Sequence, residues 1–170
     1  MRSNSRFAAA GSLLFALLGM TGQRTPEFVD IAAKSGLNDV FYCGSDTAKK
    51  YIIEALGGGV ALIDYDNDGY LDVFFVSGSR LEGFPPGQEP SNQLYRNNRD
   101  GSFTRITKEA GLIQTGWGQG VCAGDYDNDG FIDLFVTYFG QSRLYRNMGN
   151  GRFTDVTALA GIPSEARWAI

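Results

Sequence analysis

Apolar and polar positions along the chain indicate many short strands. The apolar residues come in short runs of β-branched and aromatic types, such as residues 73–76 and 134–136, separated by segments rich in Gly, Asp and Asn. Such runs favour strands, and Gly and Asn favour the tight turns between them. The chain has 23 Gly and only 5 Pro among 170 residues, a length that suits one domain. The pattern predicts an all-β fold.

The same pattern returns at a spacing of 50 residues. Residues 103–112 are repeated at 153–162, and an earlier copy stands at 28–37. The motif Leu-Tyr-Arg-Asn occurs at 94–97 and again at 144–147. Self-similarity at a fixed period is typical of repeat architectures, so each period is predicted to be one structural unit.

Each unit is predicted to contain four antiparallel strands. In the first unit they are expected near residues 59–63, 71–76, 93–97 and 102–106, with equivalents in the second. Four strands in a unit of about 50 residues are typical of a β-propeller blade, so the chain is predicted to form about two blades of a partial propeller.

Turn signals separate these strands. Asp100-Gly101 and Asn150-Gly151 predict two-residue hairpin turns in which both central residues have positive φ. After the fourth strand, residues 107–110 and 157–160 are expected to form a single helical turn that ends at a left-handed glycine, Gly111 or Gly161.

Two acidic nonapeptides, residues 64–72 and 125–133, carry the candidate chemistry. Each has Asp at positions 1, 3, 5 and 9 and Gly at position 6. Clustered carboxylates repel one another without a cation, and oxygen ligands suit Ca²⁺ better than Zn²⁺ or copper. An EF-hand is excluded, because position 12 should be a bidentate Glu and is Phe75 or Val136. A solvated acidic turn without an ion is the alternative.

The predicted ligands of each loop are the four carboxylates and the backbone carbonyl at position 7. Asn67 and Asn128, at position 4, are expected to support the turn. About two structural Ca²⁺ ions per chain are predicted, held by Asp64, Asp66, Asp68, Tyr70 and Asp72 in the first loop and by Asp125, Asp127, Asp129, Phe131 and Asp133 in the second.

Other recurring residues are predicted to have structural roles. Arg96 and Arg146 are expected to pair with backbone or nearby Asp, a basic ring around a channel being the alternative. Trp117 and Trp168 are expected to pack beneath the acidic loops, with sugar stacking as the alternative. The inter-blade core is expected to include Phe74, Tyr95, Phe103, Phe135, Tyr145 and Phe153.

The N-terminus is predicted to be a signal peptide, residues 1–24. Arg2 and Arg6 precede an apolar stretch at 7–18 that is too short for a stable membrane anchor, and small polar residues follow. An uncleaved anchor helix is the alternative. Cleavage would leave residues 25–170 without a membrane span in a secreted protein, extracellular or periplasmic.

Charge and cysteine content narrow the functional classes. The net charge of −4 argues against a nucleic-acid partner. The chain has no His, which removes the usual general base and the commonest zinc ligand. Cys43 and Cys122 could form a disulfide after export or remain buried free thiols, and the sequence leaves both readings open.

These loops between strands, with the Leu-Tyr-Arg-Asn hairpins and the repeated segments at 28–37, 103–112 and 153–162, resemble the FG-GAP/VCBS repeats of the CRTAC/ASPIC-UnbV group. The resemblance covers residues 28–170, with a first unit at 28–106, a second at 103–156 and the start of a third at 153–170. It implies blades of a seven-bladed propeller like the integrin α head, in which Ca²⁺ pins the loops. The chain holds fewer units than that.

A secreted, non-catalytic module that binds a protein or a glycan, as in adhesion, is the predicted function. Further blades or another copy of the chain are expected to cover the apolar faces of the blades. One alternative is a truncated fragment without independent function, because the chain ends just before a third acidic loop would begin. The other is a carboxylate-based glycan-active enzyme, for which only Glu54, Glu82 and Glu89 in two insertions (38–56 and 81–91) are candidates.

Overall fold

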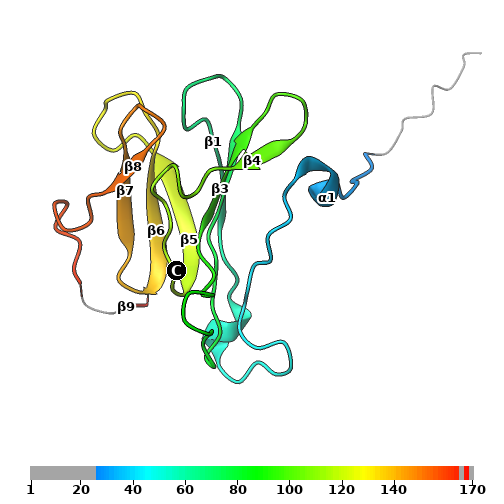
Figure 1. Cartoon of the computed structure of the whole chain (residues 1–170). Helices are drawn as coiled ribbons and strands as arrows, with labels where there is room; N and C mark the ends of the chain where they lie inside the picture. The colour runs from blue at the N-terminus through cyan, green and yellow to red at the C-terminus, as the bar shows by residue number, and fades with distance from the viewer. Residues whose placement is uncertain (1–25, 165–166, 169–170) are drawn as a thin grey trace, which may run out of the picture.

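The computed structural model describes residues 26–164 and 167–168, which form two antiparallel sheets side by side (Figure 1). The first sheet has the order β1 (Val60–Ile63), β2 (Asp72–Phe75), β3 (Gln93–Asn97) and β4 (Phe103–Arg105). The second has the order β5 (Gly118–Gly124), β6 (Asp133–Gly140), β7 (Arg143–Asn147) and β8 (Phe153–Asp155), and β9 (Arg167–Trp168) pairs with β6. The all-β prediction with two four-stranded blades is confirmed. The predicted signal peptide lies outside the described residues.

Two short helices precede the first blade, α1 (Ala32–Ser35) and the 3₁₀ helix η1 (Ile52–Ala55). Helix α1 is the first copy of the helical turn that recurs at residues 107–111 and 157–161, and all three turns end at a glycine with φ between 70 and 87°. The predicted left-handed ends are therefore confirmed. Phe28 repeats Phe103 and Phe153, but it is 99% exposed and not in a strand. In the described part of the chain, it has no third strand of a blade to pair with.

Alternation along the strands sends side chains to two faces of each blade. In blade 1, the cross-strand pair of Phe74 and Leu94 faces blade 2. In blade 2, the pair of Leu134 and Tyr145 faces blade 1. Period-two alternation thus supplies two apolar faces that bury each other.

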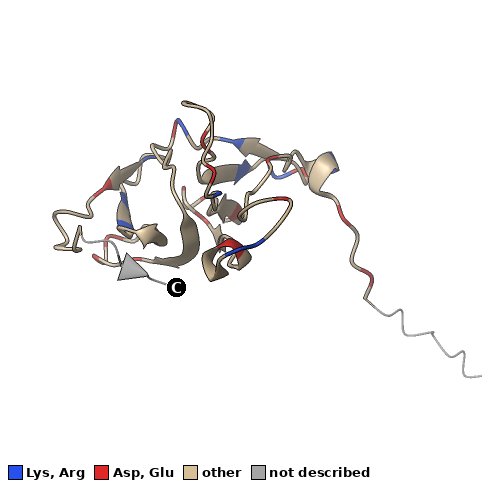
Figure 2. Cartoon of the chain, turned by 90° about the horizontal axis from the view of Figure 1, so that it is seen from below, with Lys and Arg blue, Asp and Glu red and all other residues tan. Residues whose placement is uncertain are grey.

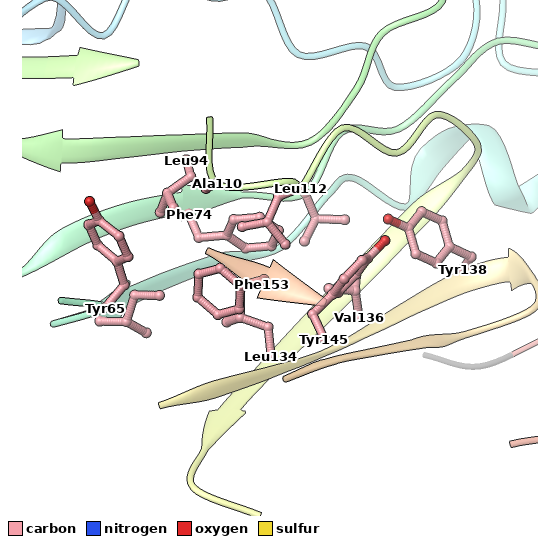
Figure 3. Packing of buried hydrophobic residues seen from close by; sticks show 12 residues of the cluster. Tyr65, Phe74, Leu94, Ala110, Leu112, Leu134, Val136, Tyr138, Tyr145 and Phe153 are labelled. Carbon is pink, nitrogen blue, oxygen red and sulfur yellow. The ribbon is translucent and has the colours of Figure 1, made fainter. Parts of the chain in front are cut away.

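The core lies between the two blades (Figure 3). Tyr65 of the first blade stacks on Phe153 of the second, with ring centroids 6.4 Å apart. Of the aromatic residues predicted for this core, Phe74, Tyr145 and Phe153 belong to it. The prediction is wrong for the other three: Tyr95 is buried on the opposite face of blade 1 against Phe75, and Phe103 and Phe135 are half-buried outside the cluster.

Trp117 is buried, but the expectation that it packs beneath an acidic loop is wrong. It immediately precedes β5, and Asp125 follows the other end of this strand. The Trp117 carbonyl accepts a hydrogen bond from the amide of Phe139 (2.8 Å). The side chain of Trp168 lies outside the described residues.

The predicted hairpin turns are also wrong in detail. Positive φ angles occur at Arg99 and Gly101 and not at Asp100, and the turn is closed by a hydrogen bond from the amide of Asn98 to the carbonyl of Ser102. The Asn97 side chain accepts from the Arg99 amide, and the Asp100 side chain accepts from the Ser102 amide. Such local side-chain turns compete with the two-residue hairpin and give a longer loop here. The second blade has the same loop, with positive φ at Gly149 and Gly151.

The two insertions pack against each other beside blade 1. The rings of Tyr42 and Phe84 pack edge to face with their centroids 4.9 Å apart, and the amide of Gly44 donates to the carbonyl of Ser79, just before the second insertion. The structure places both cysteines as free thiols, Cys43 half-buried and Cys122 exposed. The expectation of a buried thiol is wrong for Cys122, because the last three residues of β5 are exposed.

Close approach of the two blades depends on Gly118. A Cβ at this position would lie 2.3 Å from the Cγ1 of Val76 and 2.7 Å from the carbonyl oxygen of Ser77. The Gly118 amide also donates to that carbonyl (3.1 Å). We expect Gly118→Ala to lower the free energy of unfolding in urea by about 2 kcal/mol, as overpacking does. Gly124→Ala, in the same strand with open space around it, is the matched control and should change it by about 0.5 kcal/mol or less. Equal effects would contradict a close-packed interface at Gly118.

Candidate metal centre

The two acidic loops connect the first and second strands of each blade. Asp64 follows β1 and Asp72 begins β2, and Asp125 and Asp133 stand in the same relation to β5 and β6. Positions 4 and 6 are left-handed in both loops, with φ of 54° at Asn67, 86° at Gly69, 58° at Asn128 and 88° at Gly130. Asn and Gly tolerate this conformation, so each loop folds back on itself. The two Asn residues therefore support the turn, as predicted.

Position 1 holds the turn together. In the first loop, the two carboxylate oxygens of Asp64 accept hydrogen bonds from the amides of Asp68 (2.9 Å) and Gly69 (2.8 Å). Asp125 accepts from the amides of Asp129 (3.1 Å) and Gly130 (2.9 Å) in the second loop. A carboxylate that accepts one bond per oxygen keeps further lone pairs for a cation.

Position 9 is buried at the base of each loop. Asp72 and Asp133 are each 1% exposed. Asp72 accepts from the amides of Tyr65 (3.2 Å) and Asn97 (2.8 Å), so it connects its loop to the end of β3. Asp133 makes the same two contacts, with the amides of Tyr126 (3.0 Å) and Asn147 (2.7 Å).

Position 3 supplies the atom that fits a cation. In both loops Oδ1 of this residue, Asp66 or Asp127, is buried and has no hydrogen-bond partner among the described residues. Buried polar atoms are almost always paired, so the same orphan atom in two loops calls for an explanation. Oxygens of positions 1, 3 and 9 lie within 4.8 Å of one another in each loop.

The carboxylate at position 5 of each loop forms an ion pair with an arginine. Asp68 accepts from Arg99 (2.7 Å), and Arg146 contacts both Asp129 (3.0 Å) and Asp127 (2.7 Å). The structure therefore brings together positions 1, 3 and 9 of each predicted ligand set, and Asp68 and Asp129 stand outside these groups. The carbonyls of Tyr70 and Phe131 remain predicted ligands; the amides of these residues donate to Asp68 (2.9 Å) and Asp129 (3.0 Å). Arg146 thus pairs with nearby Asp, as predicted.

The electrostatics of the first loop favour a cation. Burial raises the pKa of Asp72 to about 6, against opposing hydrogen bonds from the amides of Asn97 and Tyr65. Burial and the nearby carboxylates of Asp68 and Asp64 raise the pKa of Asp66. The side-chain hydrogen bond from Arg99 holds the pKa of Asp68 below its usual value. Positive charge is already favourable at this loop, and a divalent cation would stabilise the charged carboxylates further.

The donor set suits Ca²⁺. It consists of carboxylate oxygens, with backbone carbonyl as the other predicted donor, and hard cations prefer such ligands. Ca²⁺ tolerates six to eight ligands in flexible geometry, whereas Mg²⁺ demands near-ideal octahedral geometry. The residues present therefore fit this ion.

Glu54, the leading candidate for a catalytic carboxylate, has a structural position. It is 1% exposed, and its oxygens accept from the amides of Lys50 (2.8 Å), Tyr51 (3.0 Å) and Ser45 (3.3 Å). Burial would raise the pKa of Glu54, but these three backbone hydrogen bonds hold it below its usual value. This geometry suits a carboxylate that organises the insertion around η1.

Sequence reasoning missed the asparagines that end the Leu-Tyr-Arg-Asn motifs and the arginine that follows the first motif. The backbone amides of Asn97 and Asn147 donate to the position 9 carboxylates, and the side chain of Arg99 pairs with Asp68. The motif itself was a signal for the asparagines, since both copies end on Asn. Arg99 has no equivalent in the second unit, where a Cβ at Gly149 would lie 2.6 Å from the ring of Phe131.

Acidic and basic positions are interspersed over the molecule (Figure 2). In the described part of the chain, no helix is long and apolar enough to cross a bilayer.

Two four-stranded blades with an acidic loop between the first two strands of each define a repeat protein of the propeller class. The FG-GAP-like repeat family model matches residues 64–136 and 125–170, which together make up more than half of the chain. The chain therefore belongs to the FG-GAP-like repeat family, and these repeats indicate a propeller-like interaction module. A search of curated proteins finds no match.

Proposed function

We propose that this chain is an exported, calcium-binding propeller module that binds a protein or a glycan and catalyses no reaction. The observation that carries the proposal is the buried, unpartnered Oδ1 of Asp66 and of Asp127 at the same position of two loops. A cation bound in each loop would satisfy the Oδ1 atom of that loop and would hold the loop in one conformation.

In each loop, the carboxylates at positions 1, 3 and 9 would hold the ion. The carboxylate at position 5 would also bind the ion, and its contact with arginine would then be lost. The carbonyl at position 7 is the proposed fifth ligand. The ion supplies positive charge that neutralises the cluster, and its role is structural.

A non-catalytic role is favoured by the distribution of the carboxylates. The Asp residues at position 9 are held by backbone amides, and so is Glu54 in its insertion. General acid–base chemistry on a glycan needs a pair of carboxylates with room for the substrate between them, and Glu54 is 1% exposed.

Two further observations support the proposed export and, with it, a role in adhesion. The pattern of residues 1–24 favours a signal peptide, and FG-GAP repeats are typical of extracellular proteins. The Leu-Tyr-Arg-Asn hairpins and the recurring helical turns favour the CRTAC/ASPIC-UnbV group within the family. Further blades or another copy of the chain would cover the outer faces of the two blades.

Calorimetric titration of the chain with Ca²⁺ tests the proposal. We expect two ions per chain for the wild type and one ion for Asp125→Asn/Asp127→Asn, which removes two ligand charges and one of the two acceptors that Asp125 offers to the loop amides. Asp64→Asn/Asp66→Asn should abolish the other site. Asp46→Asn, an acidic position in the first insertion, is the control for the loss of a carboxylate outside the loops and should leave two sites. Absence of ion uptake by the wild type would contradict the proposal.

A further inference from the structure

Two asparagines outside the predicted ligand sets connect the two acidic loops. The side-chain amide of Asn67, in the first loop, donates to the carbonyl of Gly130 in the second loop (3.0 Å). The side-chain amide of Asn147, at the end of β7, donates to the carbonyl of Tyr65 in the first loop (2.7 Å). The two loops therefore contact each other directly across the interface between the blades.

Each of these two hydrogen bonds, called links below, is connected to a carboxylate that holds one of the loops in place. Asn147 donates its backbone amide to Asp133 (2.7 Å), and Tyr65 donates its backbone amide to Asp72 (3.2 Å). One asparagine and the backbone of one tyrosine thus join the buried position 9 carboxylates of the two loops. In the second link, the Gly130 amide donates to Asp125 (2.9 Å) while the Gly130 carbonyl accepts from Asn67.

The equivalent asparagines make no such contacts. The side-chain amide of Asn97, which corresponds to Asn147, donates to Leu71 of its own blade (3.0 Å). Asn128, which corresponds to Asn67, has no side-chain hydrogen bond to the first loop among the described residues. Among the described residues, the links therefore start from Asn67 and Asn147, and the repeat provides matched residues, Asn128 and Asn97, that lack them.

We propose that Asn67 and Asn147 are positioning residues that couple the two cation sites, so that filling one raises the affinity of the other. This inference rests on the proposed function. An ion in the second loop fixes Asp125 and Asp133, and through them the Gly130 carbonyl and the Asn147 side chain. These groups hold Tyr65 and Asn67 in the conformation in which the first loop binds. By linkage, an ion in the first loop acts on the second by the same factor.

The coupling is measured by calorimetric titration with Ca²⁺ alone. The two loop-disabled variants, Asp64→Asn/Asp66→Asn and Asp125→Asn/Asp127→Asn, give the affinity of each loop without its neighbour. We expect the product of the two stepwise affinities of the wild type to exceed the product of these single-site affinities by about tenfold, within the usual range for coupled sites.

Asn67→Gly tests the link itself. Glycine keeps the left-handed conformation at this exposed position, so the variant removes the hydrogen bond without strain. We expect the coupling factor to fall about threefold, the effect of one hydrogen bond. Asn128→Gly is the matched control, since it makes the same change at the same loop position, and it should retain the wild-type factor.

The outcomes separate the coupling from the proposed function. Two ions that bind with a coupling factor near one, or equal effects of Asn67→Gly and Asn128→Gly, would overturn the coupling and leave the calcium sites in place. A wild-type chain that takes up no Ca²⁺ would overturn both.

Discussion

Saturating Ca²⁺ is expected to raise the free energy of unfolding of this chain by about 5 kcal/mol. An ion that binds only the folded state adds about 2.7 kcal/mol at a concentration one hundred times its dissociation constant, and two loops bind. For a domain of this size, 1 kcal/mol corresponds to a change in melting temperature of about 2–4 °C, so the expected increase is about 10–20 °C. Thermal unfolding followed by circular dichroism, with Ca²⁺ or with a chelator at equal ionic strength, measures it.

Asp66→Asn/Asp127→Asn is the sharpest control for this effect. In each loop it replaces the carboxylate whose Oδ1 has no partner by a neutral side chain of the same shape, and it leaves the position 9 anchors intact. With chelator, the variant should melt at or slightly above the wild-type temperature, because it removes repulsion within each cluster. With Ca²⁺, its melting temperature should change by only a few degrees. A variant that keeps the full calcium shift would show that the stabilising ions bind elsewhere.

The sequence was sufficient to predict the strands, because each strand is specified by a local alternation that occurs twice. The predicted segment 93–97 matches β3, and the segment 71–76 contains β2 (Asp72–Phe75). The left-handed ends of the helical turns were also predictable, since Gly111 and Gly161 recur at the same position. Position 1 and position 9 of the acidic loops come together because the turn between them is short and contains two left-handed residues.

Contacts between distant segments could not be predicted from the sequence. Tyr95 lies on the face of blade 1 that residues 38–42 contact, with Phe41 against Phe75 (4.7 Å) and Asp39 accepting from the Tyr95 hydroxyl. The contact from Asn67 to Gly130 joins two loops that differ only at positions 7 and 8 of the sequence. The pairing of Arg99 with Asp68 depends on a loop whose geometry is set by local side-chain hydrogen bonds. The first two depend on contacts between distant segments, and the third depends on a loop conformation that the strand pattern does not specify.

Phe74→Ala is expected to have the largest effect among the core substitutions. Phe74 is 0% exposed and lies in the core between the two blades (Figure 3). Removal of a buried Phe side chain costs about 3–5 kcal/mol, which is a large part of the stability of a typical domain. Unfolding in urea should be measured with Ca²⁺ present so that the variant remains folded at the start. Phe74→Leu, which keeps most of the apolar volume, should cost less than the alanine variant.

The repeat supplies a matched control, Phe135→Ala. Phe135 occupies the position of Phe74 in blade 2, but it is half-buried on the face that points away from blade 1 and is outside the core cluster. In the chain alone this substitution should cost about 1–1.5 kcal/mol, because a half-exposed ring loses less apolar burial and leaves no closed cavity. If Phe135→Ala costs as much as Phe74→Ala, the outer face of blade 2 is buried in solution as deeply as the inner face of blade 1. A further blade or a second copy of the chain must then cover it.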